Sequence, residues 1–270
     1  MALVQHTLRL ARHAPKCYRL FPPFGILAAH GDSRLARPME NIDSEEIARF
    51  ALQAQLWWDP RGEFKALHEI NPVRLAYVRD LAGLPGRQVL DVGCGGGLLA
   101  EAMAGLDARV TAIDMVGPVL AVARKHALDR GLSIGYHLST AEAWAVDHKG
   151  RYDVVTCMEL VEHVPDPARL IRALAEMVRP GGDLFFATVN RTWLARLLVI
   201  WLSENVLGLV RKGTHAYRRF VRPRELAVWA EAAGLQVRHL SGVRYLPFIG
   251  YAALCRSTAM NYMMHCTRPA

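Results

Sequence analysis

Hydrophobic and polar positions follow two different periods along the chain from residue 86 onward. Short apolar runs rich in β-branched residues are typical of buried strands. They cover residues 87–93, 108–114, 133–138, 152–158, 183–190, 235–243 and 257–266. Segments with a helical period lie between them, at 98–106, 117–131, 166–182 and 223–234. Strands that alternate with helices predict a parallel sheet covered on both faces. We therefore expect an α/β fold with a doubly wound, mostly parallel, seven-stranded sheet.

Two segments depart from this alternation. Residues 44–58 and 71–83 have helical patterns and precede the first strand, so we expect a helical cap over 39–85 before the main domain, 86–270. Residues 191–222 form an insert after the fifth strand. Its uncharged run is much shorter than the roughly 20 residues of a transmembrane helix. A broad apolar face with basic ends fits either a helix lying in a membrane interface or a lid over an active site.

The first 38 residues have a composition of their own. They contain six Arg or Lys residues and one acid, Asp32, and so supply +5 of the formal net charge of +8. The remaining chain is nearly charge-balanced, which argues against nucleic acid as a partner. An Arg-rich, acid-poor leader is typical of a mitochondrial transit peptide. The other interpretation is that Met39 is the true start and residues 1–38 are an extension of the gene model.

The turn after the first predicted strand is rich in glycine. In VLDVGCGGG, three glycines alternate between Gly93 and Gly97, which lets backbone amides approach a ligand at a helix N-terminus. Leu98 stands where a dinucleotide fingerprint needs Gly or Ala. An acid, Asp91, precedes the glycines, and Asp114 ends the next strand. This combination resembles motif I of class I S-adenosylmethionine-dependent methyltransferases, in which Asp114 would accept both ribose hydroxyls.

Four further stretches narrow the resemblance. They are IARFALQAQLWWDPRGEFKALHEINPVRLAYV, CMELVEHVPDP, VNRT and KGTHAYRRFVRPREL. All four resemble the ubiquinone-biosynthesis O-methyltransferases, and the likeness runs from about Asn41 to residue 265. The resemblance implies S-adenosylmethionine as cofactor and methylation of catechol-type hydroxyls on polyprenylated phenol or quinol intermediates, at both O-methylation steps of the pathway.

The resemblance also implies a set of cofactor contacts. Arg74 is expected to bind the methionine carboxylate, because a guanidinium can clamp a carboxylate with two hydrogen bonds. After the third strand, Thr140 stands where many members carry an acid, so Glu142 becomes a candidate for the adenine contact. The predicted cofactor-binding residues are Arg74, Asp91, Gly93, Gly95, Asp114, Glu142 and Met158.

The segment YDVVTCMELVEHVPDP places Glu159, Glu162 and His163 where a buried strand ends. On a helix these spacings put the three side chains on one face. In doubly wound sheets ligands bind at this edge. A phenol with a pKa of about 10 needs a base or a metal to form phenolate at neutral pH.

Three interpretations of this cluster remain open. The three side chains can hold a divalent ion (Mg²⁺, Mn²⁺ or Zn²⁺), His163 can act as a general base, or the cluster can have a structural role. The same ExxEH pattern occurs in small-RNA 2′-O-methyltransferases, where a further histidine completes a metal site. His215 is the candidate for that position here. We therefore predict Glu159, Glu162, His163 and His215 as catalytic residues.

Two other functions stay as alternatives: an RNA 2′-O-methyltransferase, and a non-catalytic scaffold of a quinone-biosynthesis complex. As partners we expect the polyprenylated substrate, a membrane surface contacted through 191–211, and other ubiquinone-biosynthesis proteins, with no nucleic acid. The expected location is the cytoplasm, peripheral on the inner face of the membrane. If residues 1–38 are a transit peptide, the matrix side of the mitochondrial inner membrane takes its place.

Overall fold

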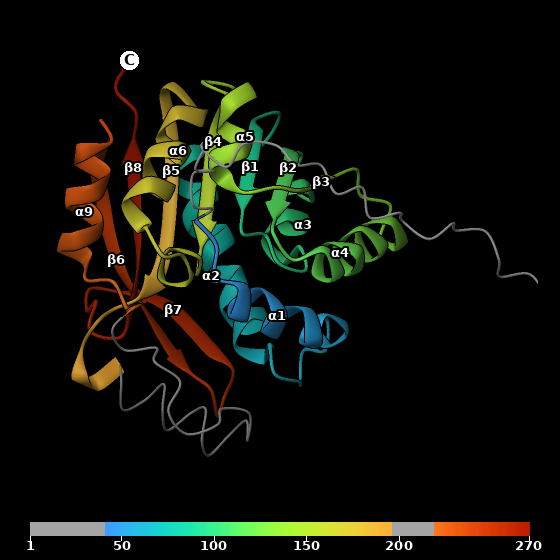
Figure 1. Cartoon of the computed structure of the whole chain (residues 1–270). Coiled ribbons are helices and arrows are strands. Elements are labelled where there is room, and N and C mark those ends of the chain that lie inside the picture. The colour runs from blue at the N-terminus through green and yellow to red at the C-terminus, as the bar shows by residue number, and fades with distance from the viewer. Residues whose placement is uncertain (1–40, 196–218) are drawn as a thin grey trace, which may run out of the picture. The chain divides into compact units, whose positions relative to one another are not determined.

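The computed structural model describes residues 41–195 and 219–270, which form one eight-stranded sheet flanked by helices (Figure 1). The strand order is β3-β2-β1-β4-β5-β8-β6-β7. The strands are β1 Gln88–Val92, β2 Arg109–Asp114, β3 Gly135–Leu138, β4 Tyr152–Met158, β5 Val178–Val189, β6 Gln236–Leu246, β7 Tyr251–Cys255 and β8 Asn261–Thr267. The helices are α1 Ser44–Gln53, η1 Ala54–Leu56, α2 Lys65–Ala82, α3 Leu98–Ala104, α4 Gly117–Asp129, α5 Ala141–Asp147, η2 Val161–His163, α6 Pro167–Met177 and α9 Pro223–Ala232.

The pairing of the strands confirms the predicted α/β fold. Strands β1 to β5 pair in parallel, whereas β8 runs antiparallel between β5 and β6. The expected count of seven strands was one too low among the described residues. The additional strand, β7, pairs only with β6 at the edge of the sheet. Its residues, YAALC, are apolar but include no β-branched residue, so the composition typical of a strand is missing, and none of the five is buried in the sheet.

Two hydrophobic clusters cover the two faces of the sheet. On one face, α5, α6 and α9 pack through residues such as Ala145, Ile171 and Leu226. On the other, α2, α3 and α4 pack through residues that include Tyr77 and Met103. Because both faces are covered, the central strands are buried on both sides and their apolar runs are continuous, as the sequence predicted.

The cap, defined here as α1, η1 and α2, differs from the prediction at one boundary. Helix α2 begins at Lys65 and not at Asn71, and it contains Pro72 in its interior. A proline costs a helix one backbone hydrogen bond. Burial of Ile70, Tyr77 and Val78 on the same helix offsets that cost. The boundary prediction was wrong because a proline usually marks a helix start.

Helix α5 was not predicted as a helix. Thr140 caps it, since its hydroxyl accepts a hydrogen bond from the Ala143 amide at 3.0 Å. The leader, most of the insert and His215 lie outside the described residues, so the predictions made for them remain predictions. No helix in the described part of the chain is long and apolar enough to cross a membrane.

Candidate functional site

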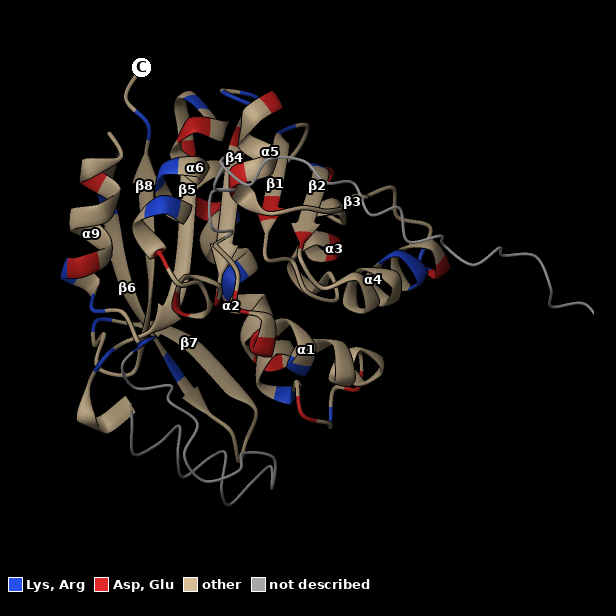
Figure 2. Ribbon diagram, in the orientation of Figure 1, with Lys and Arg blue, Asp and Glu red and all other residues tan. Residues whose placement is uncertain are grey.

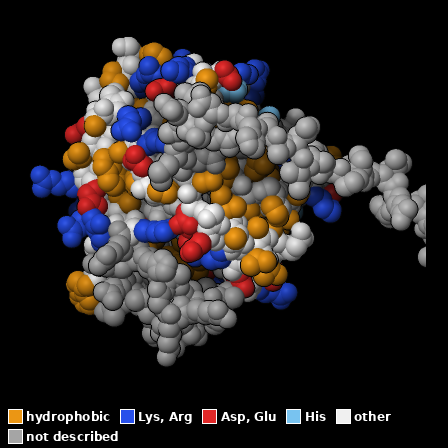
Figure 3. Space-filling view, viewed as in Figure 1, with side chains coloured by type: hydrophobic (Ala, Val, Ile, Leu, Met, Phe, Trp, Pro, Cys, Tyr) orange, Lys and Arg blue, Asp and Glu red, His pale blue; other side chains and the backbone are white. Residues whose placement is uncertain are grey.

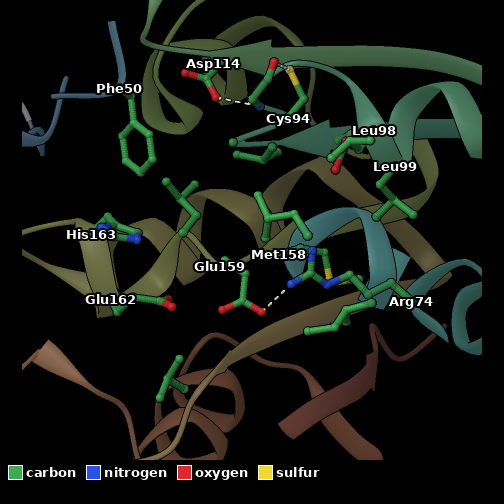
Figure 4. A pocket seen from close by; sticks show the side chains of 18 of the residues that line it. Phe50, Arg74, Cys94, Leu98, Leu99, Asp114, Met158, Glu159, Glu162 and His163 are labelled. Atoms are coloured by element: carbon green, nitrogen blue, oxygen red, sulfur yellow. Dashed lines mark hydrogen bonds and ion pairs between the residues drawn. The ribbon is translucent and has the colours of Figure 1, made fainter. Parts of the chain in front are cut away.

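A cavity of about 850 Å³ lies at the carboxyl ends of β1, β2 and β4, where a doubly wound sheet is expected to bind its ligand (Figure 4). The end of each strand contributes to its lining, and residues of α1 and α2 line it from the cap. Nearly all of the predicted site residues in the described chain meet here. The cavity is lined by Arg74, Asp91, Gly93, Gly95, Asp114, Met158, Glu159, Glu162 and His163.

The glycine turn that follows β1 depends on its glycines. Gly93, Gly95 and Gly97 have φ values of 71°, 53° and 88°, a left-handed region that side chains with a Cβ disfavour. The amide of Gly95 donates to Asp114 Oδ2 at 2.9 Å, and the amide of Val116 donates to Asp114 Oδ1 at 2.8 Å. The Asp114 carboxylate is therefore fixed beside the turn, at the end of β2.

Two tryptophans of the cap pack against the same turn. A Cβ placed on Gly95 or Gly96 would lie 2.1 Å from an atom of the Trp57 ring. The neighbouring Trp58 donates from Nε1 to the carbonyl of Gly96 at 2.9 Å. Its ring stacks on His126 of α4, with 3.5 Å between ring centroids. The absence of side chains at these glycines therefore makes room for the cap as well as for a ligand.

Burial governs the charges of the two acids near the turn. Asp91 is 3% exposed, and burial raises its pKa to about 6, although Thr156 donates a hydrogen bond to Oδ1 at 2.6 Å. Burial also raises the pKa of Asp114, against the backbone amides that donate to it. A cation or a set of hydrogen-bond donors at this end of the cavity would stabilise both carboxylates.

Arg74 of α2 forms an ion pair with Glu159, the residue that follows β4. Arg74 Nη2 lies 2.7 Å from Glu159 Oε1, and the two side chains point toward each other across the cavity (Figure 4). Glu159 has a φ of 53°, in the left-handed region, so the extended backbone of β4 ends at this residue. Arg74 Nε is buried without a hydrogen-bond partner, and a bound carboxylate would supply an acceptor.

Glu162 is buried at the same end of the cavity. Its pKa is raised to about 7, mainly by burial and then by the nearby Glu159 charge, while His163 opposes the shift. Its Oε2 accepts a hydrogen bond from the Thr188 hydroxyl at 2.8 Å. A carboxyl whose pKa lies near neutral is suited to accept a proton from a bound substrate.

His163 is held by the cap. Its Nδ1 lies 3.0 Å from Glu46 Oε2 of α1. Burial would lower the pKa of His163, but the hydrogen bond with Glu46 and the charges of Glu162 and Glu46 outweigh it, so the pKa is raised. A raised pKa keeps the imidazole protonated more often at neutral pH, which weakens the interpretation of His163 as a general base.

The expectation that Glu159, Glu162 and His163 share one helix face was wrong. The left-handed φ of Glu159 ends the strand, and only Val161–His163 form a 3₁₀ turn. The three side chains therefore contact three different partners: Arg74, Thr188 and Glu46. Within residues 41–195 and 219–270, no group of three or more His, Cys, Asp and Glu side chains is placed to hold a metal ion.

Glu142 is not part of the cavity lining. Its Oε1 accepts a hydrogen bond from Asn41 Nδ2 at 2.8 Å, and Asn41 also bonds the backbone of Asp166. The side chain thus ties the start of the cap to α5 and α6. Ser139 and Thr140 line the cavity at the end of β3 in its place.

Sequence reasoning missed the functional contacts that join distant segments. The sequence patterns assign no role to four of these residues: Trp57, Trp58, Glu46 and Thr188. Each contact links residues between 26 and 117 positions apart, as in Glu162 with Thr188 and Glu46 with His163. The periodicity of a single segment does not indicate such a pair. The one available signal is the family resemblance of the segment that contains Trp57 and Trp58.

The fold and the cavity define the chain as a class I S-adenosylmethionine-dependent methyltransferase. A family model described as a methyltransferase domain matches residues 40–240. The ubiquinone biosynthesis O-methyltransferase of Thiobacillus denitrificans is 50% identical over 232 residues, which cover 86% of this chain and all of the relative. The enzyme of the same name from Escherichia coli O9:H4 is 49% identical over 226 residues, which cover 83% of this chain and 94% of the relative. The chain belongs to the ubiquinone biosynthesis O-methyltransferase family.

Solved structures of more distant proteins share the fold. A methyltransferase of Thermotoga maritima, described as a possible histamine N-methyltransferase, aligns with a TM-score of 0.57 at 17% identity, over 84% of this chain and all of that chain. The magnesium protoporphyrin IX methyltransferase of Synechocystis with bound SAH aligns with the same TM-score at 19% identity, over 75% of this chain and 84% of that chain. At these identities the likeness concerns the fold alone.

Proposed function

We propose that the protein transfers a methyl group from S-adenosylmethionine to catechol-type hydroxyls of polyprenylated phenol and quinol intermediates of ubiquinone biosynthesis, at both O-methylation steps. The observation that carries the proposal is the make-up of one cavity. Its lining combines the glycine turn and charged side chains such as Arg74, Asp114 and Glu162 with a larger number of apolar side chains. The identity of about 50% with ubiquinone biosynthesis O-methyltransferases supports the same acceptor class.

The apolar part of the lining suits a prenylated ring. It comes from the cap, from the loop after β4, and from the hairpin that joins β6 to β7, and it includes Phe50, Leu67, Ile70, Leu160, Val243 and Leu246. Hydrophobic side chains also gather on the outer surface near α1 (Figure 3). Binding sites for small molecules are mostly apolar with a few placed polar groups, which is the arrangement found here.

The proposed roles follow from the positions of the side chains. Arg74 binds the cofactor carboxylate with the donor that Glu159 leaves free, and Asp114 accepts from the ribose hydroxyls. The cofactor supplies the methyl group in an in-line displacement, so positioning by the cavity does much of the work. Glu162 accepts the phenolic proton, because it is buried beside the cavity and its pKa is raised to about 7.

The test is methyl transfer from labelled S-adenosylmethionine to a short-chain prenylated catechol, with wild type, Glu162→Gln and the surface control Glu176→Gln. Removal of a general base typically lowers kcat by about 10² to 10⁴. We expect a loss of that size and no rate increase with pH near 7 in Glu162→Gln, while Glu176→Gln stays within about twofold of wild type. Unchanged kcat in Glu162→Gln would overturn its assignment as the base.

A divalent ion is the alternative way to acidify the hydroxyl. The donor set among the described residues does not fit one, because Glu159, Glu162 and His163 each contact a different protein partner. The same assay with a chelator, followed by Mg²⁺, Mn²⁺ or Zn²⁺, measures this directly. If the chelator abolishes turnover and an added ion restores it, the ion and not Glu162 is the activating group.

We also propose that the enzyme acts as a peripheral protein on the inner face of the membrane, alongside other ubiquinone-biosynthesis proteins, with residues 191–211 as one contact. An interfacial site suits a substrate whose prenyl chain resides in lipid. If residues 1–38 direct the chain to mitochondria, the matrix side of the inner membrane is the corresponding place. Cell fractionation with and without residues 1–38 distinguishes the two locations.

A further inference from the structure

The hairpin formed by β6 and β7 carries an exposed apolar tip. Residues 247–250 connect the two strands, and Ile249 is 74% exposed at the turn. Leu246 and Tyr251 face each other in the last strand pair and are 43% and 49% exposed. Leu254 of β7 is 44% exposed. Several large apolar side chains on one tip are unusual for a surface in contact with water alone and mark an interaction site.

The charged residues of the hairpin itself are of one sign. No acidic residue follows Glu231 in the sequence, whereas Arg244 is exposed on β6, two residues before the last strand pair. In Figure 2 the ribbons of β6 and β7 accordingly carry no acidic residue. Lys65 at the start of α2 lies beside the turn, with Nζ 3.5 Å from the Pro247 carbonyl. Basic side chains around an apolar wedge complement a surface of anionic lipid headgroups.

One acid lies beside the turn and is paired with a lysine. Glu69 of α2 accepts a hydrogen bond from the Tyr245 hydroxyl at 2.6 Å and lies 3.7 Å from Lys65 Nζ. Because Lys65 and Glu69 offset each other, the net positive charge beside the turn comes from Arg244.

The inner side of the same hairpin is a wall of the cavity. Leu246 and Pro247 line it, opposite Ala66, Leu67 and Ile70 of α2. Apolar surface is thus continuous from the cavity to the exposed tip. A polyprenyl chain of several units extends well beyond a cavity that also holds the cofactor and the ring, and this continuous surface offers it an apolar path outward.

We propose that the β6–β7 tip inserts into the headgroup region of an anionic bilayer and that the prenyl chain of the acceptor enters the cavity along this hairpin. The proposal rests on the proposed function for its substrate. A bilayer fits the tip better than a protein does, because a typical protein interface buries about 800 Å² on each partner. The turn of a two-stranded hairpin offers a narrow wedge and not a broad patch.

Co-sedimentation of the full chain with vesicles tests the lipid contact. The probes are vesicles of phosphatidylcholine alone and of phosphatidylcholine with phosphatidylglycerol. The matched variants are Ile249→Glu and Leu128→Glu, since Leu128 is 77% exposed on α4 and receives the same charge. We expect wild type to prefer the anionic vesicles, and Ile249→Glu to weaken binding at least about tenfold, a factor that corresponds to burial of one isoleucine side chain. Leu128→Glu should bind as wild type does.

The charge part of the proposal has its own variant. Arg244→Gln should weaken binding to anionic vesicles and leave binding to neutral vesicles unchanged. Equal binding of wild type, Ile249→Glu and Arg244→Gln to anionic vesicles would overturn the proposal. A change in oligomeric state of Ile249→Glu in sedimentation velocity, with vesicle binding intact, would assign the tip to contacts between copies instead.

Kinetics separate this proposal from the proposed function. Ile249→Glu should turn over a short-chain, water-soluble acceptor within about twofold of wild type and lose at least about tenfold on a long-chain acceptor embedded in anionic vesicles. Equal losses on both acceptors would contradict the assigned path. If wild type fails on the short-chain acceptor, the proposed function fails, and the vesicle binding experiment still decides the lipid contact.

Discussion

The indole nitrogen of Trp58 donates a hydrogen bond to the backbone carbonyl of Gly96, with 2.9 Å between Nε1 and the oxygen. The contact joins the cap to the glycine turn that follows β1. The ring of Trp58 is supported from behind by His126, whose Nδ1 lies 2.8 Å from Glu101 of α3. Because α3 begins directly after the turn, the arrangement holds the turn in place from two sides.

Trp58→Phe should weaken the binding of S-adenosylhomocysteine by about 3- to 10-fold, which corresponds to the loss of one hydrogen bond. The aromatic ring and its stacking on His126 remain, so the thermal midpoint should fall by no more than it does in the control variant Trp144→Phe. Isothermal titration gives Kd, and a thermal melt gives stability. The Michaelis constant of the acceptor should not change, because the substituted group contacts the turn and not the apolar part of the cavity.

Trp144→Phe is the matched control. Its Nε1 also donates a hydrogen bond of 2.9 Å, but to the Tyr152 hydroxyl, on the side of the sheet covered by α5 and α6. It should lower the thermal midpoint and leave cofactor affinity unchanged. If both variants lose only stability, Trp58 has no positioning role for the cofactor.

The packing of Trp57 on the glycine turn predicts that substitutions at Gly96 and Trp57 have non-additive effects on the unfolding free energy. Gly96 does not have a positive φ, so Gly96→Ala tests space alone, and its Cβ would lie 2.1 Å from Trp57 Cδ1. Overpacking of this kind costs about 1–3 kcal/mol of unfolding free energy. In a Trp57→Ala background the same change should cost less than about 0.5 kcal/mol, because the clashing ring is gone.

Gly117→Ala serves as the control for the glycine prediction, since a Cβ there meets nothing within 4 Å. Urea denaturation of the four proteins of the cycle, and of this control, gives the required free energies. Equal costs of Gly96→Ala with and without the Trp57 ring would show that the ring does not occupy the space in solution.

Arg74 is expected to distinguish ligands that carry an amino-acid group from those that do not. Arg74→Gln removes the cation but keeps a polar side chain, so binding of S-adenosylhomocysteine should weaken by about 10- to 100-fold, as for a charge-assisted hydrogen bond. Binding of 5′-methylthioadenosine, which lacks the carboxylate, should change little. Arg79→Gln is the control, because Arg79 lies on the same helix and is exposed beside Asp80.

An equal loss for both ligands would contradict the assigned contact. It would indicate that Arg74 acts mainly by holding Glu159, whose carboxylate would otherwise lie partly buried beside Glu162 without its cation.

Local signals in the sequence predicted the scaffold of the site well. The β4 segment, the glycine turn and the acid that ends β2 all lie where the pattern placed them, because each depends on neighbours in the chain. The edge strand β7 and helix α5 were missed. Strand β7 has no buried apolar run, and α5 is a short helix that begins at a Thr140 cap.

The orientation of side chains in the site could not be predicted from the sequence. Glu159 was expected to share a helix face with His163, but its left-handed φ turns it toward Arg74, a residue 85 positions earlier. The choice of partner depends on where α2 packs over the sheet. That packing is decided by burial of residues such as Tyr77 against both α3 and the strands, which no single segment encodes.

The burial of Asp91 predicts that the stability of the protein depends on pH, and that the isosteric substitution Asp91→Asn removes this dependence. Burial raises the pKa of its carboxyl to about 6 in the folded protein, from about 4 in an unfolded chain. Between these values the folded state binds more protons, so this carboxyl lowers the unfolding free energy as pH rises from about 4 to about 6, and its effect is constant above that range. Asp91→Asn keeps an oxygen that accepts from Thr156 but does not titrate.

Urea denaturation of the cofactor-free protein at pH 4.5, 5.5 and 7.0 measures the effect of Asp91. The unfolding free energy of wild type minus that of Asp91→Asn should fall by on the order of 2 kcal/mol across this range, because one pKa unit corresponds to about 1.4 kcal/mol. Most of the fall should occur below pH 6. A difference that stays constant with pH would show that the Asp91 carboxyl keeps an ordinary pKa, and that its burial beside Asp114 is relieved by water or by motion of the cap.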